Sequence, residues 1–238
     1  MNKIMQLYTD NQARVRHPLN LVKNGSDATL YIYDVIDADY GISAMSVIEA
    51  ISQAAGSKTL NIRINSPGGS VFEARAIIEA IKRFDGETVA HIDSVAASAA
   101  TGIAAAASKT LIAEGAFYMI HNASGIAFGD KNTMREVANL LEKVEGSLVA
   151  DYTAKTGKDD QQIIDWMNNE TWFTAAEAVA HGFADSIAET ATKPKNVWNL
   201  SAFNHPPDEL KKELIEPAPA GFFMSASNEN ALKLATSF

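Results

Sequence analysis

Cysteine is absent from the sequence, which excludes disulfide bonds and thiolate chemistry and suits a reducing cytoplasm. Long hydrophobic runs are missing too. The Ala-rich stretch around Ala104 is interrupted by Ser98, Thr101, Gly102 and Ser108, and the start, MNKIMQLYTDNQARVRHP, has no apolar core of signal-peptide length. We therefore expect a soluble, unsecreted protein of the cytoplasm with no membrane partner.

Basic residues are outnumbered, because 20 Lys and Arg stand against 29 Asp and Glu and give a formal net charge of -9. Such a chain is repelled at long range by nucleic-acid phosphates and by anionic lipids. The charge balance therefore excludes general nucleic-acid binding. It favours no particular other partner.

Two catalytic signatures are missing as well. The chain has no GxSxG elbow, the usual turn of α/β hydrolases, and no Walker A sequence, so ATP dependence is not predicted. We also expect no cofactor and no metal ion.

The composition that remains is that of an ordinary globular domain of 238 residues, 47% hydrophobic and 21% charged. Alternating β-rich segments, Ala28–Ile36 and Thr59–Asn65, are each followed by a segment with helical spacing, Ser43–Ala54 and Ser70–Phe84. This strand, turn and helix unit recurs at least three times and predicts an α/β fold with a mainly parallel sheet. The expected apolar helix faces contain Met45, Ile48, Ile51 and Ala55 in the first helix, and Phe72, Ala76, Ile77, Ala80 and Ile81 in the second.

Further along, the strand candidates KTLIAEG and AFYMIH precede a long amphipathic helix at about 131–156 and a shorter one near 161–168. The long helix carries an apolar stripe that needs a partner surface. The stripe consists of Val137, Leu140, Leu141, Val144, Leu148 and Val149.

Three regions are expected: an N-terminal extension at 1–26, the domain at 27–189, and a C-terminal tail at 190–238. The tail is rich in Pro, Asn and Ser, with one short helix expected at 208–215. It is either a partly flexible, surface-draped extension or a docking or cleavable segment, since the stretch AGFFMSA is apolar.

Ser98, in VAASAATG, begins a helix of small residues directly after a strand-like segment. Its hydroxyl would therefore lie at a helix N-terminus, where unpaired amides favour developing negative charge. Taken alone, such a serine is more often an N-cap or a small packing residue.

His121 ends the apolar strand FYMIH, at the carboxyl edge where open α/β sheets usually carry their sites. The other four histidines have no companion motif. Glu170, in NNETWF, lies between two helices and could face His121, while Asp165 and Asp185 are competitors that spacing does not exclude.

The order of these motifs is more informative than any one of them. INSPGGS is followed by AAS, whose Ser98 is 29 residues after Gly69, then by MIH, whose His121 is 23 residues after Ser98, and then by an acid directly before TWFTAAEAVAHGFADSI. This series resembles the proteolytic subunits of the Clp protease family. ETWF and the N-terminal stretch YDVIDADYGISAMSVIEAI are similar to the phage and prophage head-maturation protease branch of that family.

The resemblance implies the fold, a superhelix of stacked ββα units shared with crotonases, and the roles of individual residues. Ser98 is the nucleophile, His121 the general base and Glu170 the third member, while the amides of Gly69 and Ala99 form the oxyanion hole. It also implies that the long helix joins subunits into homo-oligomeric rings and that substrate binds as an added strand. The substrate-binding residues are Gly68, Ser70, Val71, Asn122, Ala123 and Ser124.

The sequence departs from the family pattern at several positions. The third member is commonly Asp, where Glu170 stands here; Ala99 and Ala100 replace the usual Met-Gly; and HNAS replaces His-Gln-Pro after the strand. The N-terminal forty residues lack the loops by which the better-known members engage an unfoldase.

The expected function is therefore an ATP-independent serine endopeptidase that cuts capsid or scaffold protein during phage prohead maturation in the host cytoplasm. Two alternatives stay open at this point. One is a crotonase-fold enzyme acting on an acyl-CoA thioester, and the other is a ring-forming structural protein with a degenerate site.

Overall fold

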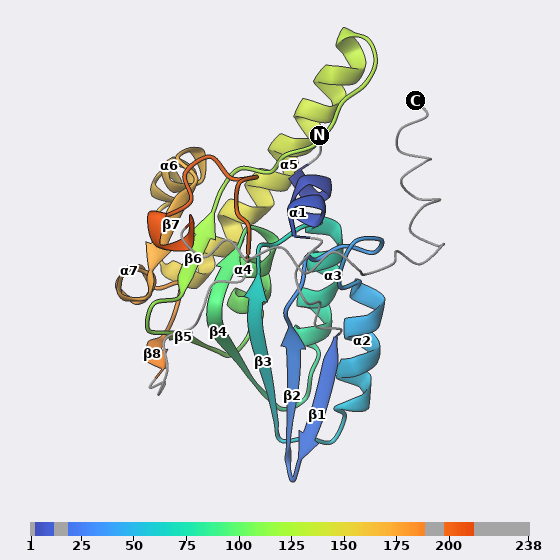
Figure 1. Ribbon diagram of the computed structural model, residues 1–238, viewed down its shortest axis with the longest axis vertical. Helices are drawn as coiled ribbons and strands as arrows, with labels where there is room; N and C mark the ends of the chain where they lie inside the picture. Colours follow the sequence, from blue (N-terminus) through green and yellow to red (C-terminus); the bar gives the residue numbers. More distant parts are fainter. Residues whose placement is uncertain (1–2, 12–18, 189–197, 212–238) are drawn as a thin grey trace, which may run out of the picture.

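The computed structural model describes residues 3–11, 19–188 and 198–211. One eight-stranded sheet forms its centre, with strands in the order β1-β2-β3-β4-β5-β8, while β6 pairs with β4 and β7 (Figure 1). The strands are β1 Asn20–Asn24, β2 Asp27–Ile32, β3 Thr59–Ser66, β4 Glu87–Ala97, β5 Lys109–Ala113, β6 Phe117–Ile120, β7 Thr171–Thr174 and β8 Ser186–Ala188. All pairings are parallel except β1 with β2 and β6 with β7, so the expected mainly parallel sheet is confirmed.

The long strand β4 divides the sheet into two branches. Its first half, Val89–Ile92, pairs with β5, and its second half, Val95–Ala97, pairs with β6. The carboxyl ends of β4 and β6 therefore lie next to each other, while β5 ends beside the first half of β4. This edge is where the chain turns from β4 into its next helix.

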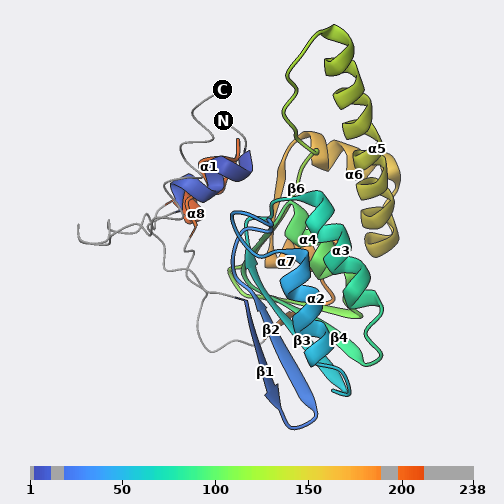
Figure 2. The same ribbon diagram turned by 90° about the vertical axis from the view of Figure 1, so that its right-hand side faces the viewer.

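The helices α2, Ala44–Gln53, and α3, Val71–Lys82, cover one face of the sheet with α4, Ala99–Ala106 (Figure 2). Their N-caps are Ser43 and Ser70, whose hydroxyls accept amide hydrogen bonds from the first turn. The expected faces were partly wrong, because Met45 is 65% and Phe72 is 68% exposed. The buried faces include Ala44, Val47, Ala50 and Ile51 in α2, and Ala74, Ile77, Ile78 and Ile81 in α3.

The physical reason for that difference is the small side chains in each face. Alanines at the contact let a helix approach the sheet closely, and the Ile side chains beside them fill the core. A face centred on Met45 or Phe72 would hold these helices further from the strands. Spacing alone does not distinguish two apolar faces that differ by one residue.

The long helix α5 covers Lys131–Thr156, as expected, and projects from the body of the molecule (Figure 1). Asp130 caps its first turn, and Gly157, with a φ of 68°, ends it. The expected stripe is only partly covered, since Val149 is buried and Leu140 is 50% exposed. Among the described helices, none is long and apolar enough to cross a membrane.

Two shorter helices, α6, Asp160–Asn168, and α7, Ala175–His181, pack beside β7. Thr174 and Glu177 form a reciprocal capping box at the start of α7, which agrees with the expected Thr174 cap.

The N-terminal and C-terminal regions contribute to the packed structure. β1 is the edge strand of the sheet and lies within residues 1–26, the expected extension. The helix α1, Lys3–Asp10, and residues 198–211, with the helix α8, Asp208–Lys211, pack over the carboxyl end of β4 and β6 (Figure 2). A second apolar cluster joins them there: Leu7, Val35, Val95, Ala97, Met119, Trp198, Leu200, Ala202, Phe203 and Leu210.

Residues 198–211, the described part of the expected tail, are packed against the body. Trp198 is 1% exposed, and burial of large apolar side chains stabilises this segment against the body. The AGFFMSA stretch and the second half of the helix expected at 208–215 lie outside the described residues.

Candidate active site

Ser98 lies at the junction between β4 and α4 in a backbone conformation that L-residues rarely adopt, with φ 54° and ψ -127°. Its amide donates a hydrogen bond of 2.9 Å to the carbonyl of Met119 on β6, which continues the pairing of the two strands. Strained residues of this kind persist where the surrounding structure holds them, and they concentrate at functional sites. The turn presents the Ser98 hydroxyl at the sheet edge.

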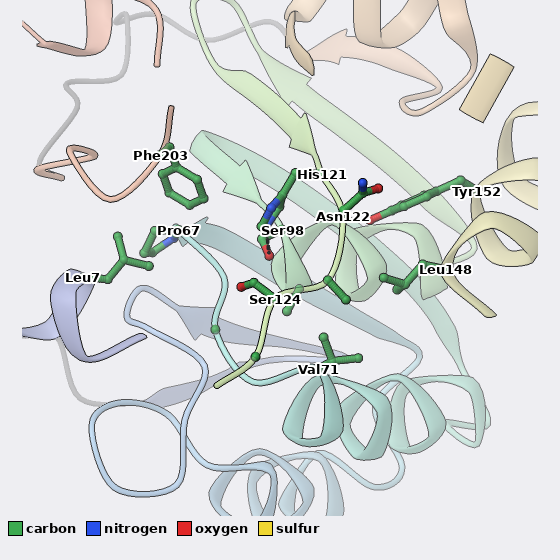
Figure 3. Close-up of a pocket in the computed structure, with 14 residues that line it drawn as sticks. Leu7, Pro67, Val71, Ser98, His121, Asn122, Ser124, Leu148, Tyr152 and Phe203 are labelled. Atoms are coloured by element: carbon green, nitrogen blue, oxygen red, sulfur yellow. Dashed lines mark hydrogen bonds between the residues drawn. The ribbon is translucent and has the colours of Figure 1, made fainter. Parts of the chain in front are cut away.

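His121 follows the last residue of β6, so the parallel pairing of β4 and β6 brings it to the same edge as Ser98. The Nε2 atom of His121 lies 2.8 Å from the Oγ atom of Ser98 (Figure 3). The Phe203 ring packs against the imidazole, with ring centroids 5.8 Å apart and planes nearly perpendicular. The structure thus brings together the two residues expected from the sequence.

Glu170 reaches the site through the antiparallel pairing of β6 and β7. Ile120 is the partner of Thr171, so the next opposite positions are His121 and Glu170. Glu170 has a φ of 48° and is only 5% exposed. Its side chain is therefore held inside the protein, directly before β7 and beside the end of β6 where His121 follows.

The carboxylate of Glu170 accepts three hydrogen bonds from the segment after residue 197. Its Oε1 accepts from the amides of Asn204 and His205 at 2.7 and 2.8 Å, and its Oε2 accepts from the Asn204 side chain at 3.1 Å. Neither partner was expected from the sequence. No local pattern signals them, because they lie in a stretch without sustained periodicity.

The two competing acids are engaged elsewhere. Asp185 accepts a hydrogen bond of 2.6 Å from the amide of Thr110 and lies 3.3 Å from Lys155. Asp165 on α6 accepts from the side chain of Gln161. The β6–β7 register places Glu170 next to the end of β6, whereas the two aspartates bond to other parts of the chain.

The Pro-Gly-Gly turn is fixed against the segment after β2. The Ile36 amide donates to the Gly68 carbonyl at 2.9 Å, and the Ser70 amide donates to the Ile36 carbonyl at 2.7 Å. In this parallel bridge the amide of Gly69, between them, points away from Ile36. A Cβ on Gly69 would lie 2.2 Å from the Ile36 carbonyl oxygen, so only glycine fits this close approach.

The second expected amide belongs to Ala99, the first residue of α4. Amides in the first turn of a helix have no intrahelical acceptor, so this one is available to a ligand. Gly69 and Ala99 both line the pocket that contains Ser98 and His121. The arrangement can therefore direct two backbone donors at an oxygen bound beside Ser98.

The pocket has a volume of about 100 Å³ (Figure 3). Of the residues expected to bind substrate, it contains Val71, Asn122, Ala123 and Ser124, whereas Gly68 and Ser70 belong to the supporting turn. Leu7 and Phe203 line one side of it, and Leu148 and Tyr152 the other. These four were not expected, because each comes from an element whose packing the local pattern does not reveal.

A buried hydroxyl network lies behind Ser98. Thr101 Oγ1 donates to the Ser98 carbonyl at 2.5 Å and lies 2.6 Å from the Tyr152 hydroxyl, while the Tyr118 hydroxyl donates to the Thr101 carbonyl at 3.1 Å. Burial raises the pKa of Tyr152 to about 12, so its phenol stays neutral over the physiological range. The network supports the strained turn and adds no charge to it.

Taken together, a serine hydroxyl hydrogen-bonded to a histidine, at the N-terminus of a helix on a parallel sheet edge, defines a serine hydrolase arrangement. Among the described residues, His, Asp and Glu form no group of three that could hold a metal ion.

Comparison with known proteins agrees with this class. The Clp protease family model matches residues 21–191, and the chain belongs to this family of serine peptidases. The proteolytic subunit of the ATP-dependent Clp protease from Streptococcus sanguinis is 31% identical over 138 residues, which cover 56% of this chain and 70% of that protein. The subunit from Porphyromonas gingivalis is 27% identical over 181 residues, or 70% of this chain and 76% of the relative.

A solved structure shows the same fold. A ClpP1 mutant from Listeria monocytogenes superposes with a TM-score of 0.58 at 24% identity, covering 68% of this chain and 92% of that one. The expected fold class is thereby confirmed.

Proposed function

We propose that this protein is a serine endopeptidase in which Ser98 is the nucleophile, His121 the general base and Glu170 the residue that orients the histidine. The observation that carries the proposal is the 2.8 Å contact between Ser98 Oγ and His121 Nε2, at a strained turn beside two available amides. Each of these features has a separate structural cause, and all meet at one sheet edge. Their convergence favours catalysis over an incidental N-cap serine.

In the proposed reaction, His121 takes the Ser98 proton as Oγ attacks the carbonyl carbon of the scissile peptide bond. The carbonyl oxygen becomes an oxyanion that accepts hydrogen bonds from the amides of Gly69 and Ala99. His121 then returns the proton to the leaving amine, and the C–N bond breaks to leave an ester on Ser98. Water, deprotonated by His121, hydrolyses that ester and restores the serine.

The role of Glu170 follows from its position opposite His121 across the β6–β7 pair. A carboxylate there would hold the proton of the other ring nitrogen and stabilise the imidazolium that forms during attack. Glu is one methylene longer than the commoner Asp. The backbone of Glu170 has a positive φ of 48°, and this conformation determines the direction in which the longer side chain leaves the chain.

The substrate is an extended peptide that lies along Asn122, Ala123 and Ser124 and the glycine turn. Apolar side chains, among them Val71 and Leu148, line the adjoining part of the pocket, so a small apolar residue before the scissile bond fits best. We propose that the natural substrate is the capsid or scaffold protein of a phage prohead. The support for this finer role is the similarity of ETWF and the N-terminal stretch to the head-maturation branch.

We further propose that the chain works without ATP and as a homo-oligomeric ring. The exposed apolar residues on α5 and the loop before it support assembly, since Phe128 is 85% and Met134 52% exposed. The support for ATP independence is that the N-terminal forty residues lack the loops by which better-known members of the family engage an unfoldase.

Neither alternative function is favoured. An acyl-CoA enzyme would use the two amides but would leave the Ser98–His121 hydrogen bond without a role. A degenerate structural ring protein would not need Glu170 buried and held by three donors opposite His121.

The proposal is tested by labelling the full chain with a fluorophosphonate probe and locating the adduct by mass spectrometry. We expect the adduct on Ser98, with labelling abolished in Ser98→Ala and strongly slowed in His121→Ala. Ser52→Ala, which removes an exposed hydroxyl on α2, serves as the matched control and labels normally. An adduct on another serine, or labelling that persists in Ser98→Ala, would remove Ser98 from the mechanism.

A further inference from the structure

The described residues after the family-matched region form a strap across the candidate site. We define the C-terminal strap as residues 198–211, which follow the Clp protease match at 21–191. The large apolar side chains of this segment are at most 6% exposed, so it is packed as part of the core. They are Trp198, Leu200, Phe203 and Leu210. Its position over the carboxyl ends of β4 and β6 places it directly at Ser98 and His121 (Figure 3).

Two kinds of contact join the strap to the catalytic residues. Asn204 and His205 donate three hydrogen bonds to the Glu170 carboxylate, at 2.7, 2.8 and 3.1 Å. Phe203 packs edge-on against His121 and also against Trp172, with ring centroids 5.8 and 5.5 Å apart. One short stretch of chain therefore holds the acid and limits the rotation of the imidazole.

The strap is itself anchored at the other side of the site. The Trp198 indole donates to the side chain of Asn65 at 2.9 Å, at the end of β3 where the Pro-Gly-Gly turn begins. Asn199 and Asn11 exchange two hydrogen bonds, in which the Asn199 amide donates at 2.7 Å and the Asn11 side chain donates at 3.0 Å. These contacts fix the strap relative to both the turn and α1.

We infer that the C-terminal strap completes the catalytic site and that Asn204 is a positioning residue for Glu170. The inference rests on the proposed function. A Glu side chain has one more rotatable bond than Asp and loses more conformational entropy when it is fixed. Three donors from one segment overcome that freedom, because hydrogen bonds to a charged acceptor are the stronger ones and also directional. Glu170 and the strap therefore act as a unit.

Asn204 offers a clean test because the residue is exposed, so its replacement leaves the core intact. Asn204→Ala removes the side-chain donor to Glu170, and Asn204→Asp replaces it with a carboxylate that repels Glu170. Glu209→Gln, an exposed change on α8 of the same strap, is the matched control. Each variant is made in the wild-type chain, and Asn204→Ala is also made in a Glu170→Gln background.

The measurement is the rate of fluorophosphonate labelling of Ser98 against pH, with thermal unfolding as a check on folding. Asn204→Ala should slow labelling about tenfold, as expected when one hydrogen bond to a charged group is lost. The same change should have little further effect in Glu170→Gln, because Asn204 acts through that carboxylate. Glu209→Gln should label like the wild type.

The pH profile separates positioning from a merely structural role. In Asn204→Asp the added negative charge favours the imidazolium of His121, and labelling needs the neutral imidazole. The acid limb of the profile should therefore move to higher pH, a shift that Glu209→Gln should not show.

Two results would overturn this inference while leaving the proposed function intact. One is a wild-type labelling rate in Asn204→Ala, and the other is an equal fold-loss of that rate from Asn204→Ala in the wild-type chain and in the Glu170→Gln background. If the wild-type chain itself is not labelled on Ser98, the proposed function falls and this inference falls with it.

Discussion

The indole N–H of Trp198 donates a hydrogen bond of 2.9 Å to the side-chain oxygen of Asn65, 133 residues earlier in the chain. Both side chains are buried, so the bond links the C-terminal strap to the base of the glycine turn in a dry environment. We expect Trp198→Phe to lower the free energy of unfolding by about 1–3 kcal/mol, since Asn65 loses its buried donor.

Trp172 provides the matched control for that change. Its indole nitrogen is buried and has no hydrogen-bond partner within the described part of the chain. Trp172→Phe therefore loses ring area but no hydrogen bond, and urea unfolding should show a smaller loss than for Trp198→Phe. Equal losses in the two variants would show that the Asn65 bond contributes nothing.

The strain at Ser98 predicts a difference between two inactive variants. Ser98→Gly and Ser98→Ala both remove the nucleophile, but only glycine accepts a φ of 54° with a ψ of -127° at low cost. We expect Ser98→Gly to be more stable than Ser98→Ala by about 1 kcal/mol in chemical unfolding. A less stable glycine variant would mean that the backbone there is relaxed.

Gly68 and Gly56 test how crowded the glycine turn is. They share nearly the same φ, 88° and 83°. A Cβ on Gly68 would lie 2.5 Å from the Ala97 carbonyl oxygen and 2.9 Å from the Ala99 nitrogen, whereas a Cβ on Gly56 would have no atom within 4 Å. Gly68→Ala should cost about 3 kcal/mol or more and prevent Ser98 labelling, whereas Gly56→Ala should cost about 1 kcal/mol. Similar costs would contradict the close approach of the turn to Ser98.

Phe128, before α5, tests the proposed assembly. A ring requires a solution mass that is a multiple of the 25.6 kDa chain, measured by light scattering after size exclusion. Phe128→Ser removes an 85% exposed aromatic ring and should lower that mass. The control, Lys131→Ser at an exposed position nearby, should leave the mass unchanged. A monomeric wild type would refute the ring.

His91 predicts a pH dependence of stability. Burial, followed by repulsion from Arg63, lowers its pKa below the ordinary value of 6.5. The unfolded imidazole therefore binds a proton at a higher pH than the folded one, so stability is complete above about 6.5 and falls as the pH drops toward the folded pKa. Thermal unfolding of His91→Gln should show a weaker loss between about pH 7 and 5, and an unchanged slope would contradict the shift.

Local patterns predicted several elements well. The bounds of α5 and the Thr174 cap of α7 agree with the structure, because both depend on capping residues and periodicity within a few turns. Ser98 and His121 were also recognisable as candidates, since each directly follows a strand and the spacing of the motifs resembled a known family. The faces of α2 and α3 were partly misjudged, because which face lies on the sheet depends on how closely the alanines let the helix approach.

The sequence by itself determined the class of fold and the chemistry available: recurring strand and helix units, a serine at a helix N-terminus, a histidine at a strand end and no thiol. Only the tertiary structure decided where the three acids lie, because strand register brings Glu170 beside the end of β6 and leaves Asp165 and Asp185 bonded elsewhere. It also decided that residues 198–211 pack against the body and that Phe203 lines the pocket at Ser98. Contacts between residues far apart in the chain depend on the assembled core, and no local periodicity encodes them.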